Sequence, residues 1–70
     1  MGKFAENLAR LRVEKDLTQD ELARRVGVSQ PAIAQYEKGT LTPKLYVTMR
    51  LANVFGVTIE QLVNGKEETA

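Results

Sequence analysis

The side chains best suited to a specific chemical task lie between residues 19 and 38, where glutamines occur together with small residues. Gln19, Gln30 and Gln35 each carry an amide, which offers a hydrogen-bond donor and an acceptor side by side. Ala34, next to the last of them, leaves room for another molecule to come close. In the major groove of DNA an adenine presents one donor and one acceptor, which an amide can match. These residues therefore favour recognition by hydrogen bonds.

Catalytic and metal-binding chemistry finds no support in the composition. The chain has no histidine and no cysteine, so Ser-His or Cys-His pairs, disulfides and thiolate or imidazole metal sites are excluded. It also has no Gly-rich phosphate loop and no paired carboxylates that indicate a pocket. We therefore expect no enzyme activity, no metal and no cofactor.

Length and hydropathy indicate one small domain. Seventy residues suffice for a single domain with a modest core. No apolar run approaches the roughly 20 residues that span a bilayer, and no apolar signal core follows the first residues. We expect a cytoplasmic protein that does not associate with membranes. The net charge of +1 says little about its partners.

Capping residues in the segment that contains the glutamines predict two short helices joined by a tight turn. Thr18 and Glu21 have the spacing of a capping box, in which each side chain satisfies the other residue's backbone N–H. Gly27 fits the position after a helix, where the backbone turns left-handed. Ser29 then serves as the N-cap of the next helix. Pro31 falls in the first turn of that helix, where a missing N–H does no harm.

Two longer helices flank this pair. Residues 3–15 carry apolar side chains at helical spacing. Thr42 has the character of an N-cap, and Pro43 after it is favoured at the first position of a helix. This combination predicts a helix over residues 43–55.

A short fifth helix completes an all-α fold, a compact five-helix bundle without strands. Thr58 and Gln61 form a second capping box, and the helix that they open ends by residue 65. We expect residues 1–65 to form the domain and residues 66–70 to be a short flexible tail. The default core consists of apolar residues at helical spacing: Leu8, Leu11, Leu22, Val26, Val28, Ile33, Leu45, Ala52, Phe55 and Leu62.

The helix over residues 30–37 has two faces with different tasks. Ile33, with Tyr36 or Glu37 one turn later, can anchor the helix to the rest of the domain. The opposite face is small and polar enough to enter the major groove of DNA. That face consists of Gln30, Pro31, Ala34, Gln35 and Lys38. The glutamines among these residues could instead be ordinary surface amides.

The motifs of this chain resemble those of the lambdoid-phage repressor and Cro family of helix-turn-helix proteins, also called the xenobiotic-response-element family. The resemblance spans residues 8–62 and implies a lambda-repressor-like fold, with the helix-turn-helix in the second and third helices. It also implies a small sequence-specific DNA-binding transcriptional regulator that acts as a repressor. The residues that carry it are Leu11-Arg12, residues 17–23, residues 26–30, Ile33, Glu37, Gly39, Pro43, Leu51-Ala52 and Gly56-Val57.

The resemblance implies roles for matching residues. Gln30 resembles a residue that contacts a base, often adenine, and Gln19 resembles one that bonds a DNA phosphate and braces the recognition helix. Arg12 and Glu37 match a structural ion pair between the first and third helices. Together with the polar face described above, the expected base contacts are Gln30, Pro31, Ala34 and Gln35. The expected backbone contacts are Gln19, Ser29, Lys38, Thr40, Thr42 and Lys44.

A single recognition helix contacts few base pairs, so we expect a homodimer on a palindromic double-stranded operator, with half-sites about 34 Å apart. The expected dimer interface surrounds the last helix and consists of Val54, Ile59, Gln61 and Val63. The helix over residues 43–55 is apolar on more than one face, so one stripe can enter the core and another can bind a partner. An alternative function is therefore an antitoxin-type or other protein-binding module that also binds DNA.

Overall fold

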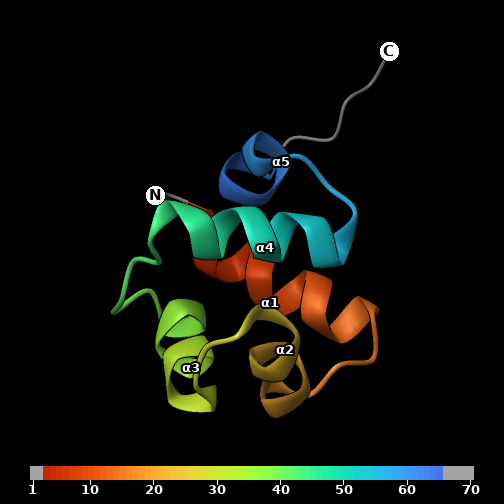
Figure 1. Ribbon diagram of the computed structural model, residues 1–70. Coiled ribbons are helices and arrows are strands. Elements are labelled where there is room, and N and C mark those ends of the chain that lie inside the picture. The colour runs from red at the N-terminus through yellow and green to blue at the C-terminus, as the bar shows by residue number, and fades with distance from the viewer. Residues whose placement is uncertain (1–2, 66–70) are drawn as a thin grey trace.

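Five α-helices follow one another along residues 3–65, the part of the chain that the computed structural model describes (Figure 1). No strand occurs among these residues. The predicted all-α fold with five helices is confirmed, and the tail predicted for residues 66–70 lies outside the described part. The helices are α1 (Phe4–Glu14), α2 (Gln19–Val26), α3 (Gln30–Lys38), α4 (Leu45–Phe55) and α5 (Ile59–Asn64).

The helices pack so that the pair α2 and α3 is supported on more than one side. In Figure 1, α4 crosses in front of α1, with α5 on one side and the α2–α3 pair on the other. α3 contacts both α1 and α2, while α4 contacts α2 and α5. Because α1 also contacts α5, the first and last helices close the bundle. Within the described residues, no helix has both the length and the apolar character needed to cross a membrane.

Both predicted capping boxes are confirmed. The Glu21 backbone N–H donates to the Thr18 hydroxyl at 3.0 Å, and the Thr18 N–H donates to the Glu21 carboxylate at 2.8 Å. Thr58 and Gln61 repeat both contacts with the same distances at the start of α5. The pKa of Glu21 is held below its usual value by hydrogen bonding with Thr18. The bond with the Thr18 backbone has the larger effect and the one with its side chain the smaller.

The turn between α2 and α3 requires a glycine. Gly27 has a left-handed backbone with φ +81°, and its N–H and that of Val28 both donate to the Ala23 carbonyl. A guanidinium N–H of Arg50 on α4 donates to the Val26 carbonyl at 3.1 Å. A Cβ on Gly27 would lie 3.1 Å from the same guanidinium nitrogen. Both the backbone conformation and the available space therefore favour glycine here.

The predicted start of the fourth helix is wrong. Thr42 is not the N-cap, because the chain remains extended through Lys44 (φ −68°, ψ 160°), and α4 begins at Leu45. Pro43 is buried in this extended segment instead of occupying the first helical position. Leu45, predicted to lie in the core, is instead the first residue of α4 and is 68% exposed.

The core is made by residues from all five helices. Seven of the predicted core residues are buried, whereas Leu11 and Val28 are partly buried and pack against the core. Leu17, in the connection between α1 and α2, is buried although it was not predicted to be. The full set is Phe4, Leu8, Leu17, Leu22, Ala23, Val26, Ile33, Tyr36, Val47, Leu51, Ala52, Phe55 and Leu62.

One polar side chain in the interior joins the two ends of the bundle. Asn7 on α1 is buried, and its amide donates to the Leu62 carbonyl on α5 at 3.0 Å. A buried amide is tolerated only when its hydrogen bonds are made. Within the described residues, no buried side-chain nitrogen or oxygen lacks a partner. The Asn7 contact therefore orients α5 against α1.

Candidate nucleic-acid interface

The polar face predicted for the third helix is accessible in the structure. Ile33 and Tyr36 are buried and anchor α3, while Gln30, Pro31 and Gln35 are exposed. Ala34 is half-buried and places no bulk on this face. The predicted base contacts therefore share one accessible surface.

The first turn of this helix is well defined. Ser29 caps it by accepting a hydrogen bond from the Ala32 N–H at 3.2 Å, and Pro31 lies in the first turn, both as predicted. Gln30 is the first residue of α3. The cap and the proline fix the backbone that carries this glutamine, so its side chain starts from a rigid position.

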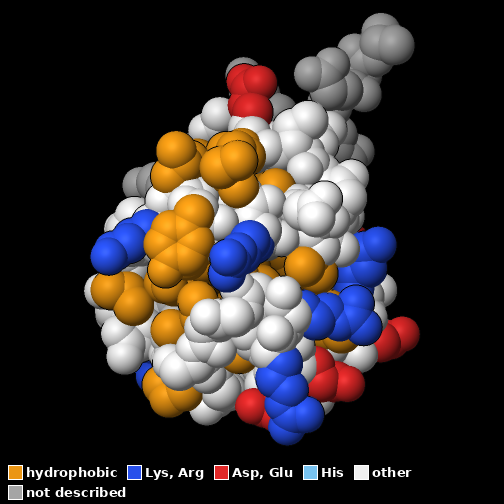
Figure 2. Space-filling view, viewed as in Figure 1, with side chains coloured by type: hydrophobic (Ala, Val, Ile, Leu, Met, Phe, Trp, Pro, Cys, Tyr) orange, Lys and Arg blue, Asp and Glu red, His pale blue; other side chains and the backbone are white. Residues whose placement is uncertain are grey.

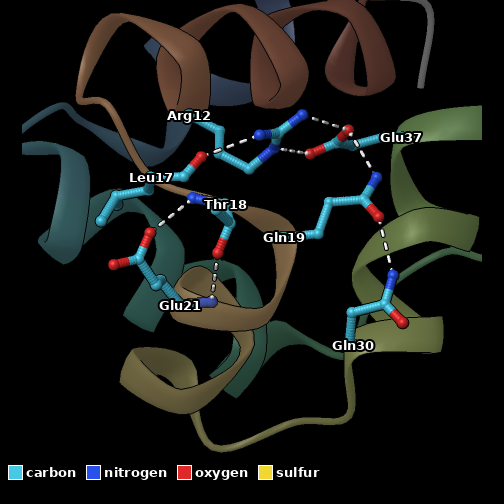
Figure 3. A network of polar contacts seen from close by, with 7 residues as sticks. All are labelled: Arg12, Leu17, Thr18, Gln19, Glu21, Gln30 and Glu37. Carbon is cyan, nitrogen blue, oxygen red and sulfur yellow. Dashed lines mark hydrogen bonds and ion pairs between the residues drawn. The ribbon is translucent and has the colours of Figure 1, made fainter.

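An ion pair connects α1 to α3 beneath this surface (Figure 3). The Arg12 Nε lies 2.6 Å from one Glu37 carboxylate oxygen, and its Nη2 lies 3.3 Å from the other. The third guanidinium nitrogen, Nη1, donates to the Leu17 carbonyl at 2.8 Å. Only 18% of the Arg12 side chain and 9% of the Glu37 side chain are exposed. This two-point contact therefore holds α1, α3 and the α1–α2 connection together at a largely dehydrated position.

Two glutamines extend the ion pair to the surface of α3. The Gln19 amide Nε2 donates to the Glu37 carboxylate at 3.1 Å, and the Gln30 Nε2 donates to the Gln19 Oε1 at 2.7 Å. Figure 3 shows the resulting chain from Arg12 through Glu37 and Gln19 to Gln30. The sequence indicated these residues as an ion pair and two DNA contacts, but not as one network. Their spacing along the chain is too irregular to reveal it, because only the packing of α3 on α1 and α2 brings them together.

The residues predicted to contact the DNA backbone surround this network or follow α3. Ser29, Lys38, Thr40, Thr42 and Lys44 are exposed, and Gln19 is half-buried. The Thr40 hydroxyl donates to the Gln35 carbonyl at 3.3 Å, which fixes the chain at the end of α3. No side chain caps α4, and the Val47 N–H donates to the Lys44 carbonyl at 3.0 Å. The N–H groups of Leu45 and Tyr46 and the positive end of the helix dipole are therefore left for an anion.

The residues predicted for a dimer interface differ in accessibility. Ile59 is 38% exposed, whereas Val54, Gln61 and Val63 are half-buried. Val54 and Val63 already pack partly against the core. The Gln61 side chain is engaged in its capping box. Ile59 is therefore the largest apolar group that this region offers to a partner.

These features define a class of protein. A glycine turn joins two short helices, the second helix exposes a face of amides and small residues, and the first braces it through a polar network. This is the architecture of a helix-turn-helix domain. The Helix-turn-helix family model matches residues 8–62, and the chain belongs to that family. The resemblance inferred from the sequence motifs is thereby confirmed.

Individual relatives agree with this assignment. The chain is 44% identical over 64 residues to the cryptic phage CTXphi transcriptional repressor RstR of Vibrio cholerae, covering 91% of this chain and 58% of RstR. It is 38% identical over 65 residues to the HTH-type transcriptional activator BcrR of Enterococcus faecalis, covering 93% of this chain and 32% of BcrR.

The fold also matches a solved structure. The crystal structure of a transcriptional regulator from Listeria innocua superimposes with a TM-score of 0.83 at 34% identity, covering 96% of this chain and 63% of that chain. The present chain therefore spans less than two thirds of the length of each of these three proteins.

Proposed function

We propose that this protein is a transcriptional regulator that binds a double-stranded DNA operator by placing α3 in the major groove. The observation that carries the proposal is the Gln30 side chain, which is exposed at the start of α3 and held there by Gln19. An amide fixed in this way can meet the edge of one base, while Ala34 allows the helix to approach closely. The relatives named above are all transcriptional regulators, and none of them is named as an enzyme.

The backbone contacts follow from the same docking. Gln19 has a second amide N–H beyond the one it donates to Glu37, and this N–H can reach a phosphate at the edge of the groove. The uncapped first turn of α4 offers backbone N–H groups to another phosphate, with Lys44 at its N-cap adding a positive charge. Such contacts set the position of the protein on the duplex, and the base contacts set the sequence.

Repression is the regulatory outcome that we propose. A repressor needs only to occupy a promoter, which a DNA-binding domain achieves by itself, whereas an activator needs an additional productive contact. The similarity to RstR, named as a repressor, supports this choice, although BcrR is named as an activator. Because the proposed partner is DNA, we retain the prediction that the protein is cytoplasmic.

We further propose that the protein binds a palindromic operator as a homodimer. One copy of α3 contacts few base pairs, and a two-fold dimer doubles the contacts on half-sites about one helical turn apart. The interface that we propose is centred on Ile59 and bordered by the half-buried Val54, Gln61 and Val63.

A base-specific test of this function is the variant Gln30→Ala on a selected operator. We expect specific binding to weaken by about 1–3 kcal/mol and the preference at one base pair to relax. The matched control is Asn53→Ala, which removes an exposed amide from α4 and leaves the preference unchanged. An unaltered preference in Gln30→Ala would remove this residue from the base contacts.

A protein-binding role is the second candidate function, and the outer face of α4 favours it. Leu45, Tyr46 and Met49 are each more than half exposed and share one face by helical spacing. Figure 2 shows hydrophobic side chains gathered over α4, with Lys and Arg side chains beside them. The only charged residue in α4 is Arg50, whose guanidinium lies 5.3 Å from the centre of the Tyr46 ring. We therefore propose a partner segment that presents apolar and acidic side chains.

Selection of helical peptides displayed on phage would test this second function. Peptides that combine apolar anchors with Asp or Glu should bind the wild-type protein and fail to bind Met49→Lys. The operator affinity of that variant serves as the control for folding. Peptides that bind both proteins equally, or self-association of the protein through α4, would contradict the proposed partner.

A further inference from the structure

Arg50 on α4 holds the turn between α2 and α3. Its Nη1 donates to the Val26 carbonyl at 3.1 Å and would lie 3.1 Å from a Cβ on Gly27. Val26 is the last residue of α2 and is 1% exposed. Among the described residues, no backbone N–H donates to its carbonyl. A carbonyl placed in this way depends on Arg50 for its hydrogen bond.

The turn determines where α3 begins. Ser29 caps α3 only two residues after Gly27, so the direction in which the chain leaves α2 sets the start of the helix that we propose for the major groove. The N–H groups of Gly27 and Val28 tie the turn to Ala23 on α2, whereas Arg50 ties it to α4. Arg50 therefore helps to fix the turn relative to the rest of the bundle.

The other edge of the Arg50 guanidinium is open to a ligand. The side chain is exposed, and the Tyr46 ring lies 5.3 Å from its central carbon. Within the described part of the chain, Arg50 forms no ion pair, and its Nε and Nη2 donate to no protein group. Two N-bearing corners of a charged group are thus directed at no protein acceptor.

Arg12 shows what such an edge binds in this protein. It too donates through Nη1 to a backbone carbonyl, that of Leu17, and its Nε and Nη2 contact the Glu37 carboxylate. A guanidinium can hold a carbonyl on one side and a carboxylate on the other, because its five N–H groups have a fixed planar arrangement. Arg50 makes the first of these contacts without the second.

We propose that Arg50 binds a carboxylate of the partner segment through Nε and Nη2, and that this contact strengthens operator binding. The inference rests on both functions proposed above. An exposed arginine has many rotamers, and a carboxylate on its open edge restricts it to the one in which Nη1 meets Val26. The turn is then ordered before α3 meets DNA, so less ordering is needed on binding. By linkage, the operator strengthens partner binding by the same factor.

A carboxylate built into α4 tests the proposal without a partner. Tyr46→Glu places an acid four residues before Arg50. The same spacing joins Asp20 to Arg24 on α2 at 2.6 Å. The matched reference is Tyr46→Gln, which also removes the ring and has the same shape as glutamate but no charge. We expect Tyr46→Glu to bind a selected operator about twofold more tightly than Tyr46→Gln, the factor that one helical ion pair supports.

The sign of this effect separates the proposal from simple electrostatics. A negative charge added to a DNA-binding protein by itself weakens binding. Met49→Glu compared with Met49→Gln adds the same charge at a position that does not face Arg50, and it should give no gain. Arg50→Lys in the Tyr46→Glu protein keeps the positive charge but not the planar fork, so the gain should disappear. A lower affinity for Tyr46→Glu than for Tyr46→Gln, or an equal gain from Met49→Glu, would overturn the proposal.

Hydrogen exchange gives a readout without DNA. The N–H groups of Gly27 and Val28 should exchange more slowly in Tyr46→Glu than in Tyr46→Gln, because the turn opens less often. Equal exchange rates would overturn the proposal even if the operator affinities differed.

The partner itself supplies the reciprocal measurement. An acidic peptide selected on α4 should bind about fivefold or more tightly in the presence of operator, and a weaker or unchanged affinity would contradict the coupling. If no acidic peptide binds α4, the protein-binding function itself is refuted, and if no operator can be selected, the DNA-binding function is. The exchange rates report on the contact between Arg50 and the turn in either case.

Discussion

Removal of the Glu37 carboxylate is the perturbation whose magnitude the structure defines best. Glu37→Ala eliminates two contacts with Arg12 and one with Gln19, at a site where 9% of the Glu37 side chain is exposed. Arg12 keeps its hydrogen bond to the Leu17 carbonyl but loses the only carboxylate that it pairs with among the described residues. Breaking a buried ion pair from one side costs about 3–5 kcal/mol.

We expect a loss near the lower end of that range, about 3 kcal/mol, because 18% of the Arg12 side chain still reaches solvent. For a domain of this size, that corresponds to a decrease in melting temperature of roughly 12–24 °C. Urea denaturation followed by circular dichroism gives the free energy of unfolding, and thermal denaturation gives the melting temperature.

The matched control is Glu14→Ala, which breaks the exposed i,i+4 pair with Arg10. The side chains of that pair are 48% and 56% exposed, so the loss should stay below about 0.5 kcal/mol. If Glu37→Ala cost no more than Glu14→Ala, the ion pair would not be what holds α1 to α3. A large fall in DNA affinity with unchanged stability would assign Glu37 a purely functional role.

Three further substitutions test other parts of the structure. Ile59→Asp should weaken dimerisation without unfolding the domain, because the side chain is partly exposed; an unaltered dimer in sedimentation would place the interface elsewhere. Asn7→Leu should lower the free energy of unfolding in urea by about 1–3 kcal/mol, because the Leu62 carbonyl loses its donor, and a loss below about 0.5 kcal/mol would contradict this. Glu21→Gln should remove part of the acid sensitivity of the fold. Because the pKa of Glu21 is lowered in the folded state, its contribution is present above the ordinary value of 4.5 and disappears as the pH falls through the folded value. Equal acid titrations of stability for the two proteins would contradict this assignment.

Local signals explain why so much of the fold could be predicted. Each capping box, Thr18 with Glu21 and Thr58 with Gln61, joins residues within one four-residue segment. The spacing in the sequence is therefore enough to predict both hydrogen bonds. The same holds for Gly27, whose left-handed conformation ends α2. Residues at such positions satisfy the backbone without help from distant parts of the chain.

Tertiary packing explains the failures. Thr42 and Pro43 have the local character of a helix start, but the chain buries Pro43 and stays extended until Leu45. The burial of Leu17 and Asn7 likewise depends on how α1 meets its neighbours. No pattern of neighbouring residues contains that information.

The candidate site shows the same division. The resemblance implied Gln19 and Gln30 as DNA contacts and Arg12 with Glu37 as a structural ion pair, but it did not join the two sets. The hydrogen bonds that join them cross 11, 18 and 25 positions of sequence and exist only because α3 packs on α1 and α2. The orientation of the amides therefore had to come from the structure.

Selection of random duplexes with the purified protein at two salt concentrations tests whether α3 binds operator DNA in a sequence-specific way. We predict enrichment of an inverted repeat with half-sites about one helical turn apart, and an adenine at the position that Gln30 contacts. Binding without enrichment, which merely weakens as the salt concentration rises, would contradict it, because backbone attraction alone behaves in that way.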